Sequence, residues 1–304
     1  MHVGAVFPQT EIGSDAGSIR EYAQAVEAMG YAYIVAYDHV LGASTASRPD
    51  WKGPYTVDST FHEPFVLFSY LAGVTRAIGF ATGIIILPQR QTALVAKQAA
   101  CLDVLSNGRL RLGVGTGWNE VEYEGLGMRF ADRGQRYDEQ IDVLRALWTK
   151  PAVTFQTAFH SIPDAGINPL PVQRPIPIWM GGGSDSPLSN RPASEKVIRR
   201  IARLADGWIP LWQPDDRGHE LLAKAHELCR EQGRDPATLG IEGRLNATRQ
   251  SESLWSDASQ AWKRMGASHL CVNTMGDGLH GAEQHLRRLE EVQKLALAAG
   301  AATR

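Results

Sequence analysis

Residues 78–115 read IGFATGIIILPQRQTALVAKQAACLDVLSNGRLRLGVG, and this stretch decides the fold. Two nearly continuous apolar runs, 78–86 and 109–115, flank a segment whose apolar positions are spaced as in a helix. Asn107-Gly108 follows that segment as a typical helix stop. Because unbroken apolar strands are typical of parallel strands covered on both faces, the stretch predicts a strand–helix–strand unit of a parallel sheet.

The same alternation continues in both directions along the chain. Alternating strands and helices favour right-handed crossovers in a parallel sheet. Eight units in 304 residues favour a closed barrel, because an open doubly wound sheet usually has fewer strands. We therefore predict an α/β fold, a (β/α)8 TIM barrel with insertion loops, in which residues 1–304 form a single domain. The eight strand-like runs are 2–7, 33–37, 78–86, 109–115, 176–180, 207–211, 240–246 and 269–273.

Three segments are longer than an ordinary loop, namely 41–62, 118–133 and 151–174. Long loops in a compact domain tend to be lids or binding loops. The first two follow predicted strands, so we expect them at the carboxyl-terminal face, where the active sites of barrels lie. The alternation resumes after each of the three, so none reads as an interdomain linker.

Composition and charge exclude several classes of partner. The net charge is −2 and no block of basic residues stands out, so we expect no nucleic acid. The three cysteines include no close pair, which fits a reducing cytosol and argues against a disulfide framework. No apolar run reaches the ~18 residues of a membrane span, and the first residues lack the pattern of a signal peptide. We therefore expect a cytoplasmic protein with no membrane partner.

Asp38 and His39 end the second predicted strand, where both side chains can point into the mouth of a barrel. A histidine at such a position can donate a hydrogen bond or a proton to a bound ring or to a substrate. The alternative is that Asp38 caps the loop and His39 only packs. We take His39 and Asp38 as the candidate catalytic residues.

Glycines mark the ends of three other predicted strands. Gly83 lies among β-branched residues, which indicates a bulge or a surface for a flat ring, although a plain buried strand is the alternative. The segment 113–117 has the spacing G-x-G-x-G, which is not the dinucleotide fingerprint, and we expect a long loop rather than a helix directly after it. The segment 181–184 reads Gly-Gly-Gly-Ser, whose backbone N–H groups can form an anion nest or merely a flexible turn.

Other residues that could take part in binding or catalysis are judged by where they fall among the predicted strands and loops. Trp51 and Trp118 fall on the long loops and are expected to line a pocket. The histidines are dispersed without the spacing of zinc motifs, so we expect no metal site. There is no G-x-S-x-G nucleophile motif. Four other tryptophans are expected in the core, namely Trp148, Trp208, Trp255 and Trp262.

Taken in order, these motifs resemble the luciferase-like monooxygenase superfamily, and within it the branch that depends on the deazaflavin coenzyme F420. The resemblance covers nearly the whole chain and is weaker after about residue 211. Each motif alone is weak, but their collinear order is specific. The motifs are Tyr37-Asp38-His39, Glu63-Pro64-Phe65, residues 81–90, Lys97-Gln98-Ala99-Ala100, residues 102–109, residues 113–120, Arg133-Gly134, residues 177–182 and Ala205-Asp206-Gly207-Trp208.

The resemblance implies where a cofactor would bind. Its ring system is expected at the end of the third strand, where the family often has a non-proline cis peptide, here at Gly83-Ile84. Asp38 and His39 match a pair that faces the ring or the substrate in related enzymes. The sequence departs from the family beyond the fifth strand, where no full set of basic phosphate ligands is found and Arg244 is a positional candidate alone. The expected cofactor-binding residues are Gly83, Ile84, Gly115, Thr116, Gly117, Asn119, Gly181, Gly182, Gly183 and Ser184, and the expected substrate pocket contains Trp51, Trp118 and Glu120.

The resemblance also implies an activity. We expect hydride transfer between coenzyme F420 and a small organic substrate, with His39 exchanging a proton and Asp38 orienting it. One alternative is an FMN-dependent monooxygenase that uses O2 and is supplied by a separate reductase. Another is a barrel that binds a flavin without turnover, since the fold alone does not fix function. By family analogy, we expect a homodimer.

Overall fold

The computed structural model describes residues 1–183, 194–247 and 252–297. By its internal contacts the chain divides into two compact units, each described here by itself. Unit 1 comprises residues 1–36, 77–79 and 179–304, and unit 2 comprises residues 37–76 and 80–178.

The main sheet is parallel and closes on itself. Hydrogen-bonded neighbours follow the order β3-β2-β1-β11-β10-β9-β8-β5-β4, and β3 also pairs with β5. Because β3 and β4 are two parts of the run predicted at 78–86, the ring has the eight strands of a (β/α)8 barrel, and the predicted fold is confirmed. The strands are β1 (His2–Val6), β2 (Tyr33–Ala36), β3 (Gly79–Thr82), β4 (Ile85–Ile86), β5 (Leu110–Gly115), β8 (Ile178–Gly182), β9 (Gly207–Pro210), β10 (Gly240–Asn246) and β11 (His269–Asn273).

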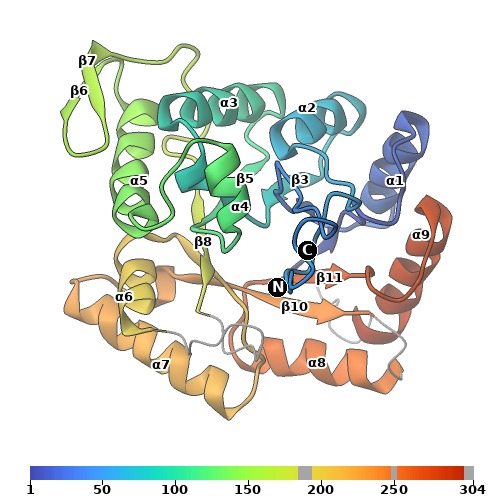
Figure 1. Ribbon diagram of the computed structural model, residues 1–304. Helices are drawn as coiled ribbons and strands as arrows, with labels where there is room; N and C mark the ends of the chain where they lie inside the picture. Colours follow the sequence, from blue (N-terminus) through green and yellow to red (C-terminus); the bar gives the residue numbers. More distant parts are fainter. Residues whose placement is uncertain (184–193, 248–251, 298–304) are drawn as a thin grey trace. The chain divides into compact units, whose positions relative to one another are not determined.

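Unit 1 shows why the predicted alternation holds. α1 begins where the side chain of Asp15 accepts a hydrogen bond from the backbone N–H of Ser18, and it buries the apolar face that contains Tyr22. α6 and α7 pack against each other (Figure 1), and Trp208 and Trp262 are buried as predicted. Its helices are α1 (Ala16–Ala28), α6 (Glu195–Leu204), α7 (Asp216–Glu231), α8 (Glu252–Arg264) and α9 (Gly281–Val292), with short turns η2 (Pro236–Thr238) and η3 (Gln293–Leu297).

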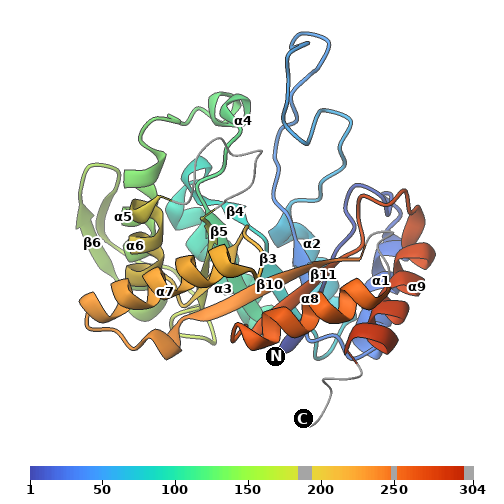
Figure 2. The same cartoon turned by 90° about the horizontal axis from the view of Figure 1, so that it is seen from below.

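Unit 2 carries the long loops. α2 begins at Pro64, the first helical position, where the missing N–H costs nothing, and Glu63 caps it by accepting from the N–H of Val66. Figure 2 shows the 41–62 loop extending well beyond α2, and Ala43 pairs with Thr56 inside it. The helices are α2 (Pro64–Val74), η1 (Leu87–Gln89), α3 (Thr92–Leu105), α4 (Glu120–Gly125) and α5 (Arg133–Thr149).

Two segments of unit 2 differ from the predicted loops. A helix, α4, does begin directly after the glycine segment, so the prediction of no helix there was wrong. Asn119 caps it by accepting from the N–H of Glu122, and acidic residues in the first turn favour its amino end. The segment 151–174 contains an antiparallel hairpin of β6 (Val153–Gln156) and β7 (Ser161–Ala165).

No helix in the described part of the chain is both long and apolar enough to span a bilayer.

Candidate functional site

Asp38 is buried just after β2, and its carboxylate forms an ion pair with Arg90. Its Oδ1 accepts from Arg90 Nη2 at 2.8 Å, and its Oδ2 accepts from the backbone N–H of Ile86 at 3.0 Å. Arg90 also donates to Glu63 at 2.9 Å. Burial by itself would lower the pKa of Arg90, but Asp38 and Glu63 together raise it above its ordinary value. Asp38 is therefore part of an ion-pair cluster within unit 2 that ties residues 38, 63 and 90 to the backbone of β4.

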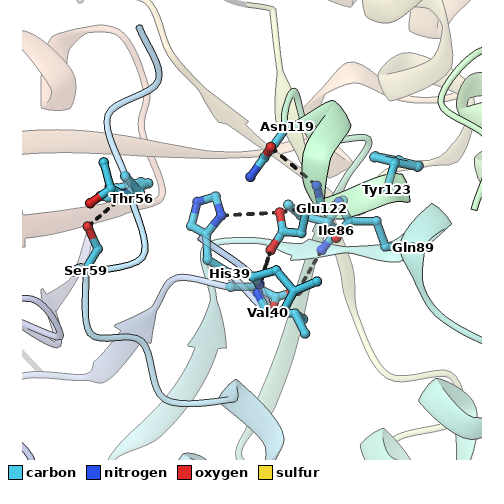
Figure 3. Close-up of polar contacts among 12 residues, drawn as sticks. His39, Val40, Thr56, Ser59, Ile86, Gln89, Asn119, Glu122 and Tyr123 are labelled. Carbon is cyan, nitrogen blue, oxygen red and sulfur yellow. Dashed lines mark hydrogen bonds and ion pairs between the residues drawn. The ribbon is translucent and has the colours of Figure 1, made fainter. Parts of the chain in front are cut away.

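His39 faces a different carboxylate from the one expected. Its Nδ1 lies 3.4 Å from Glu122 Oε2, in the first turn of α4 (Figure 3). The hydrogen bonds of Asp38 go to Arg90 and Ile86, so any orienting effect of Asp38 on His39 acts through the backbone and not through a direct hydrogen bond. The carboxylate in contact with the imidazole of His39 is that of Glu122, whose side chain is fully buried.

Glu122 is held as an anion by several donors. Its Oε1 accepts from the backbone N–H groups of Val40 and Leu41, and Gln89 Nε2 lies 3.4 Å from its Oε2. Burial by itself would raise the pKa of Glu122, but His39 and the two N–H groups hold it below the ordinary value. An ionised Glu122 therefore fixes both the imidazole and the start of the 41–62 loop.

The other ring nitrogen of His39 is turned to a pocket. Because the carboxylate of Glu122 can only accept, it favours the neutral tautomer that carries its proton on Nδ1. In the described part of the chain Nε2 is paired with no residue. The ring lies 4.7 Å from that of Tyr55 and 4.9 Å from that of Phe61, measured between centroids. With residues 40–42, 55–57, 59 and 61, His39 borders a pocket with a cavity volume of about 150 Å³.

Of the two tryptophans predicted to line the pocket, Trp118 lies beside His39 and Trp51 lies beside Trp118, and neither is among the residues that border the cavity described above. Trp118 is 5.9 Å from His39 and 5.8 Å from Trp51, and it is half-exposed at 43%. Gly53 lies between the two indoles, where an added Cβ would come within 2.6 Å of both. Glu120 is exposed at the start of α4, two residues before the buried Glu122 that contacts His39.

The backbone at the ends of β3 and β5 fits a flat ring. The peptide bond between Gly83 and Ile84 is cis, as predicted, and both residues are half-buried between the buried strands β3 and β4. Thr116 and Gly117 are half-buried at the end of β5. Gly117 has a φ of +62°, and an added Cβ would meet Ile86 at 2.7 Å. The two glycines leave partly accessible backbone without side chains at both strand ends, which fits the close approach of a planar ring such as a flavin or deazaflavin.

The glycines after β8 belong to unit 1. Gly183 has a φ of +75°, and an added Cβ would meet the indole of Trp208 at 2.7 Å. Trp208 Nε1 donates to the carbonyl of Gly182 at 2.9 Å. These glycines therefore also have a packing reason, and Ser184 lies outside the described residues. Arg244 lies within β10, where it pairs in register with Cys271.

The sequence missed four residues that the structure adds to this site: Glu122, Arg90, Tyr55 and Phe61. One signal was available, since Asn119 and Glu122 have the spacing of a helix cap followed by an acidic first turn. Across residues 1–183, 194–247 and 252–297, no three histidine, cysteine or acidic side chains are grouped to hold a metal ion.

Comparison with known proteins agrees with the barrel fold. A relative from Mycobacterium tuberculosis (strain ATCC 25618 / H37Rv), "Uncharacterized protein Rv0940c", is 38% identical over 221 residues, which cover 70% of this chain and 71% of the relative. The crystal structure of monooxygenase RslO1 from Streptomyces bottropensis has a TM-score of 0.75 at 17% identity and covers 99% of this chain and 100% of that chain.

A second solved structure is the coenzyme F420 dependent tetrahydromethanopterin reductase from Methanopyrus kandleri. It has a TM-score of 0.73 at 13% identity and covers 98% of this chain and 99% of that chain. At such identities the two solved structures show the shared fold. A family model described as luciferase-like monooxygenase matches residues 1–303. The chain therefore belongs to the luciferase-like monooxygenase family, whose members are oxidoreductases.

Proposed function

We propose that this protein transfers hydride between the deazaflavin coenzyme F420 and a small organic substrate, with His39 as the group that exchanges the proton. The observation that carries the proposal is the state of His39. Its Nδ1 is held by the ionised Glu122, and its Nε2 has no partner among the described residues and borders the pocket. A solved structure with a similar fold is a coenzyme F420 dependent reductase, which supports the choice of cofactor.

The chain's residues would divide the work as follows. Gly83, Ile84 and Thr116 to Asn119 would hold the ring and its tail, with Gly181 to Ser184 as further candidates for the tail. When bound, the deazaflavin accepts or supplies a hydride at its ring. His39 Nε2 takes the proton of a substrate hydroxyl or returns it to a carbonyl. Glu122 keeps the ring in the tautomer with Nε2 unprotonated.

Asp38 has a positioning role in this proposal. Its bonds to Arg90 and to the N–H of Ile86 keep the end of β2 in place, so that the next residue, His39, presents its ring to the pocket. Trp51, Trp118 and Glu120 would border the substrate from the two loops. We expect the enzyme to act in the cytoplasm as a homodimer.

A second candidate is an FMN-dependent monooxygenase supplied by a separate reductase. The description of the family and the monooxygenase RslO1 favour it. The same ring site and the same histidine would serve either cofactor.

Titration of the full chain with oxidised F420 and with FMN, followed by intrinsic tryptophan fluorescence, separates the two. Trp118 lies beside His39 and is half-exposed, so a bound ring should quench it. We expect saturable quenching by F420 at lower concentration than by FMN, and reduction of bound F420 when substrate is added. Tighter binding of FMN, with O2 consumed in the presence of a reductase, would replace the proposal by the monooxygenase. Binding without turnover would support a non-catalytic barrel.

A further inference from the structure

The pocket beside His39 has a lining with little charge. It is bordered by two short stretches of unit 2, one that follows β2 and one from the far end of the 41–62 loop (Figure 3). His39 supplies the imidazole of this lining. The lining residues are His39, Val40, Leu41, Gly42, Tyr55, Thr56, Val57, Ser59 and Phe61.

The charged groups nearest the pocket are already neutralised. Glu122 is matched by His39 and by two backbone N–H groups. Arg90, whose side chain is largely buried, is shared between Asp38 and Glu63. An anionic substrate would therefore lose its water without gaining a counter-charge, which is costly in a partly buried site. Asp58, exposed on the rim between two lining residues, would repel it further.

Two hydroxyl groups give the pocket its polar character. Ser59 Oγ accepts from the N–H of Thr56 at 3.1 Å, and Thr56 Oγ1 accepts from the N–H of Asp58 at 3.3 Å. Both oxygens are used as acceptors, and within the described residues neither hydroxyl hydrogen has an acceptor. They can therefore donate hydrogen bonds to a neutral oxygen of the ligand.

The apolar part of the lining sets the body of the ligand. Tyr55 and Phe61 meet edge to face, with centroids 4.8 Å apart, and both border the ring of His39. A cavity of about 150 Å³ is the size that holds a benzene molecule in another protein, so roughly six to eight non-hydrogen atoms fit.

We infer that this pocket selects an uncharged substrate of about six to eight non-hydrogen atoms, with one hydroxyl or carbonyl oxygen directed to His39 and an apolar body against Tyr55 and Phe61. Thr56, Val57 and Ser59 determine this selectivity. The inference rests on the proposed function in one respect, that the pocket beside His39 is the substrate site.

A matched pair of probes tests the preference of the pocket for uncharged ligands, called the charge filter below. Cyclopentanecarboxamide and cyclopentanecarboxylate have the same shape and differ in charge. Their dissociation constants are measured on the full chain by ligand-detected NMR. We expect the amide to bind about 100-fold more tightly than the carboxylate, because the carboxylate would remain unpaired in the pocket. Equal affinities, or tighter binding of the carboxylate or of cyclopentylmethylammonium, would overturn the inference.

A variant that gains affinity for an anion tests whether the lining residues cause this preference for uncharged ligands. Val57 lines the pocket and is 58% exposed, so Val57→Arg adds a cation at the rim without emptying the core. We expect this variant to bind the carboxylate at least ~10-fold more tightly than the parent, as a charge-assisted pair provides. Thr60→Arg is the control, because Thr60 is exposed on the same loop and does not line the pocket. A similar gain in both variants would mean that net charge alone acts, and would contradict the inference.

The two hydroxyls are tested by removal. Ser59→Ala combined with Thr56→Val should weaken amide binding roughly tenfold, since each hydroxyl donates about one hydrogen bond. Circular dichroism confirms that each variant is folded. An unchanged affinity in the folded double variant would remove Thr56 and Ser59 from the selectivity.

The cofactor titration keeps this inference separate from the proposed function. If neither F420 nor FMN binds but the amide is preferred over the carboxylate, the proposed function fails and the filter stands. If F420 binds and a phosphorylated or carboxylated substrate is turned over at this site, the function stands and the filter fails.

Discussion

Unit 2 contains two histidine–glutamate pairs, and they differ in what the second ring nitrogen meets. His39 Nδ1 lies 3.4 Å from Glu122, and its Nε2 has no partner among the described residues. His160 Nδ1 lies 2.6 Å from Glu139, and its Nε2 lies 2.6 Å from the hydroxyl of Thr92. In the second pair both nitrogens are occupied.

The occupied pair belongs to the support of the fold. Gln140 Nε2 donates to Thr92 and to the backbone carbonyls of Leu87 and Arg90, so the network links the hairpin residue His160 to η1 and α3. Burial alone would raise the pKa of Glu139, but Thr157 and His160 hold it below its ordinary value. In the His160–Glu139 pair both ring nitrogens are hydrogen-bonded, and the pair supports the fold. In the His39–Glu122 pair Nε2 has no partner among the described residues, so it is available for proton transfer.

The substitution His39→Asn is the strongest test of the distinction between the two pairs. Loss of a positioned general acid or base should lower kcat/KM by about 100- to 10,000-fold. The free energy of unfolding should fall by about 1–3 kcal/mol, because the buried carboxylate of Glu122 loses its contact with the imidazole. Steady-state kinetics and urea denaturation check the two parts. Full activity with cofactor bound would remove the role of His39.

Glu122→Gln tests the pair through its tautomer. The N–H groups of Val40 and Leu41 require an acceptor, so the amide oxygen should face them and the amide NH2 should face His39. The neutral ring would then carry its proton on Nε2 and lose its basic nitrogen. We expect kcat to fall roughly 10- to 100-fold with little change in cofactor affinity, since the base is present in the wrong form. Nitrogen NMR of the imidazole should show the tautomer change, and an unchanged spectrum would contradict it.

A third pair, His285 and Glu11 in unit 1, sharpens the comparison through pH. The side chain of His285 is buried, its Nδ1 lies 2.8 Å from Thr274 Oγ1, and its Nε2 lies 3.3 Å from Glu11. Burial, followed by the charges of Arg288 and His280, lowers the pKa of His285 from 6.5 to about 4. The unfolded chain therefore takes up a proton first as the pH falls, and stability declines between pH 6.5 and about pH 4.

His285→Gln should remove that decline. The wild-type protein is expected to lose about 2 kcal/mol from this group between about pH 7 and about pH 5, and the variant should lose correspondingly less. Urea denaturation at the two pH values measures the difference. Equal pH dependence in both proteins would show that His285 is not the group concerned.

The smallest effect on activity is expected for His160→Ala. This variant removes one hydrogen-bond partner from Glu139 and one from Thr92, which should cost about 1–3 kcal/mol of stability. Because His160 does not border the pocket, kcat/KM per folded molecule should stay within about threefold of the wild type. A loss of activity as large as that of His39→Asn would erase the distinction between the two pairs.

The fold could be predicted because its signals are local. Each run of apolar β-formers becomes a strand, and the largest displacement is the run predicted at 176–180 and observed at Ile178–Gly182. The hairpin of β6 and β7 was missed because its turn is closed by a contact that composition does not reveal, from the N–H of Thr157 to the carbonyl of His160.

The candidate site could be predicted in part, for a related reason. His39 and Trp118 were found from their place at strand ends, and they lie together. Glu122 was missed because its contact with Val40 spans 82 positions in sequence. Arg90 was missed because the sequence around it does not indicate that it pairs with the distant residues Asp38 and Glu63.

That pairing of Arg90 bears on how this enzyme's specificity can change. Asp38 stands just before the long loop and Glu63 just after it, and one guanidinium holds both. The two stems of the loop are thus fastened to a common point that is independent of whatever lies between them. Segments of other lengths and compositions can be grafted between these anchors while the backbone that carries His39 keeps its course. Evolution, or an engineer, can exchange the recognition surface here as a module.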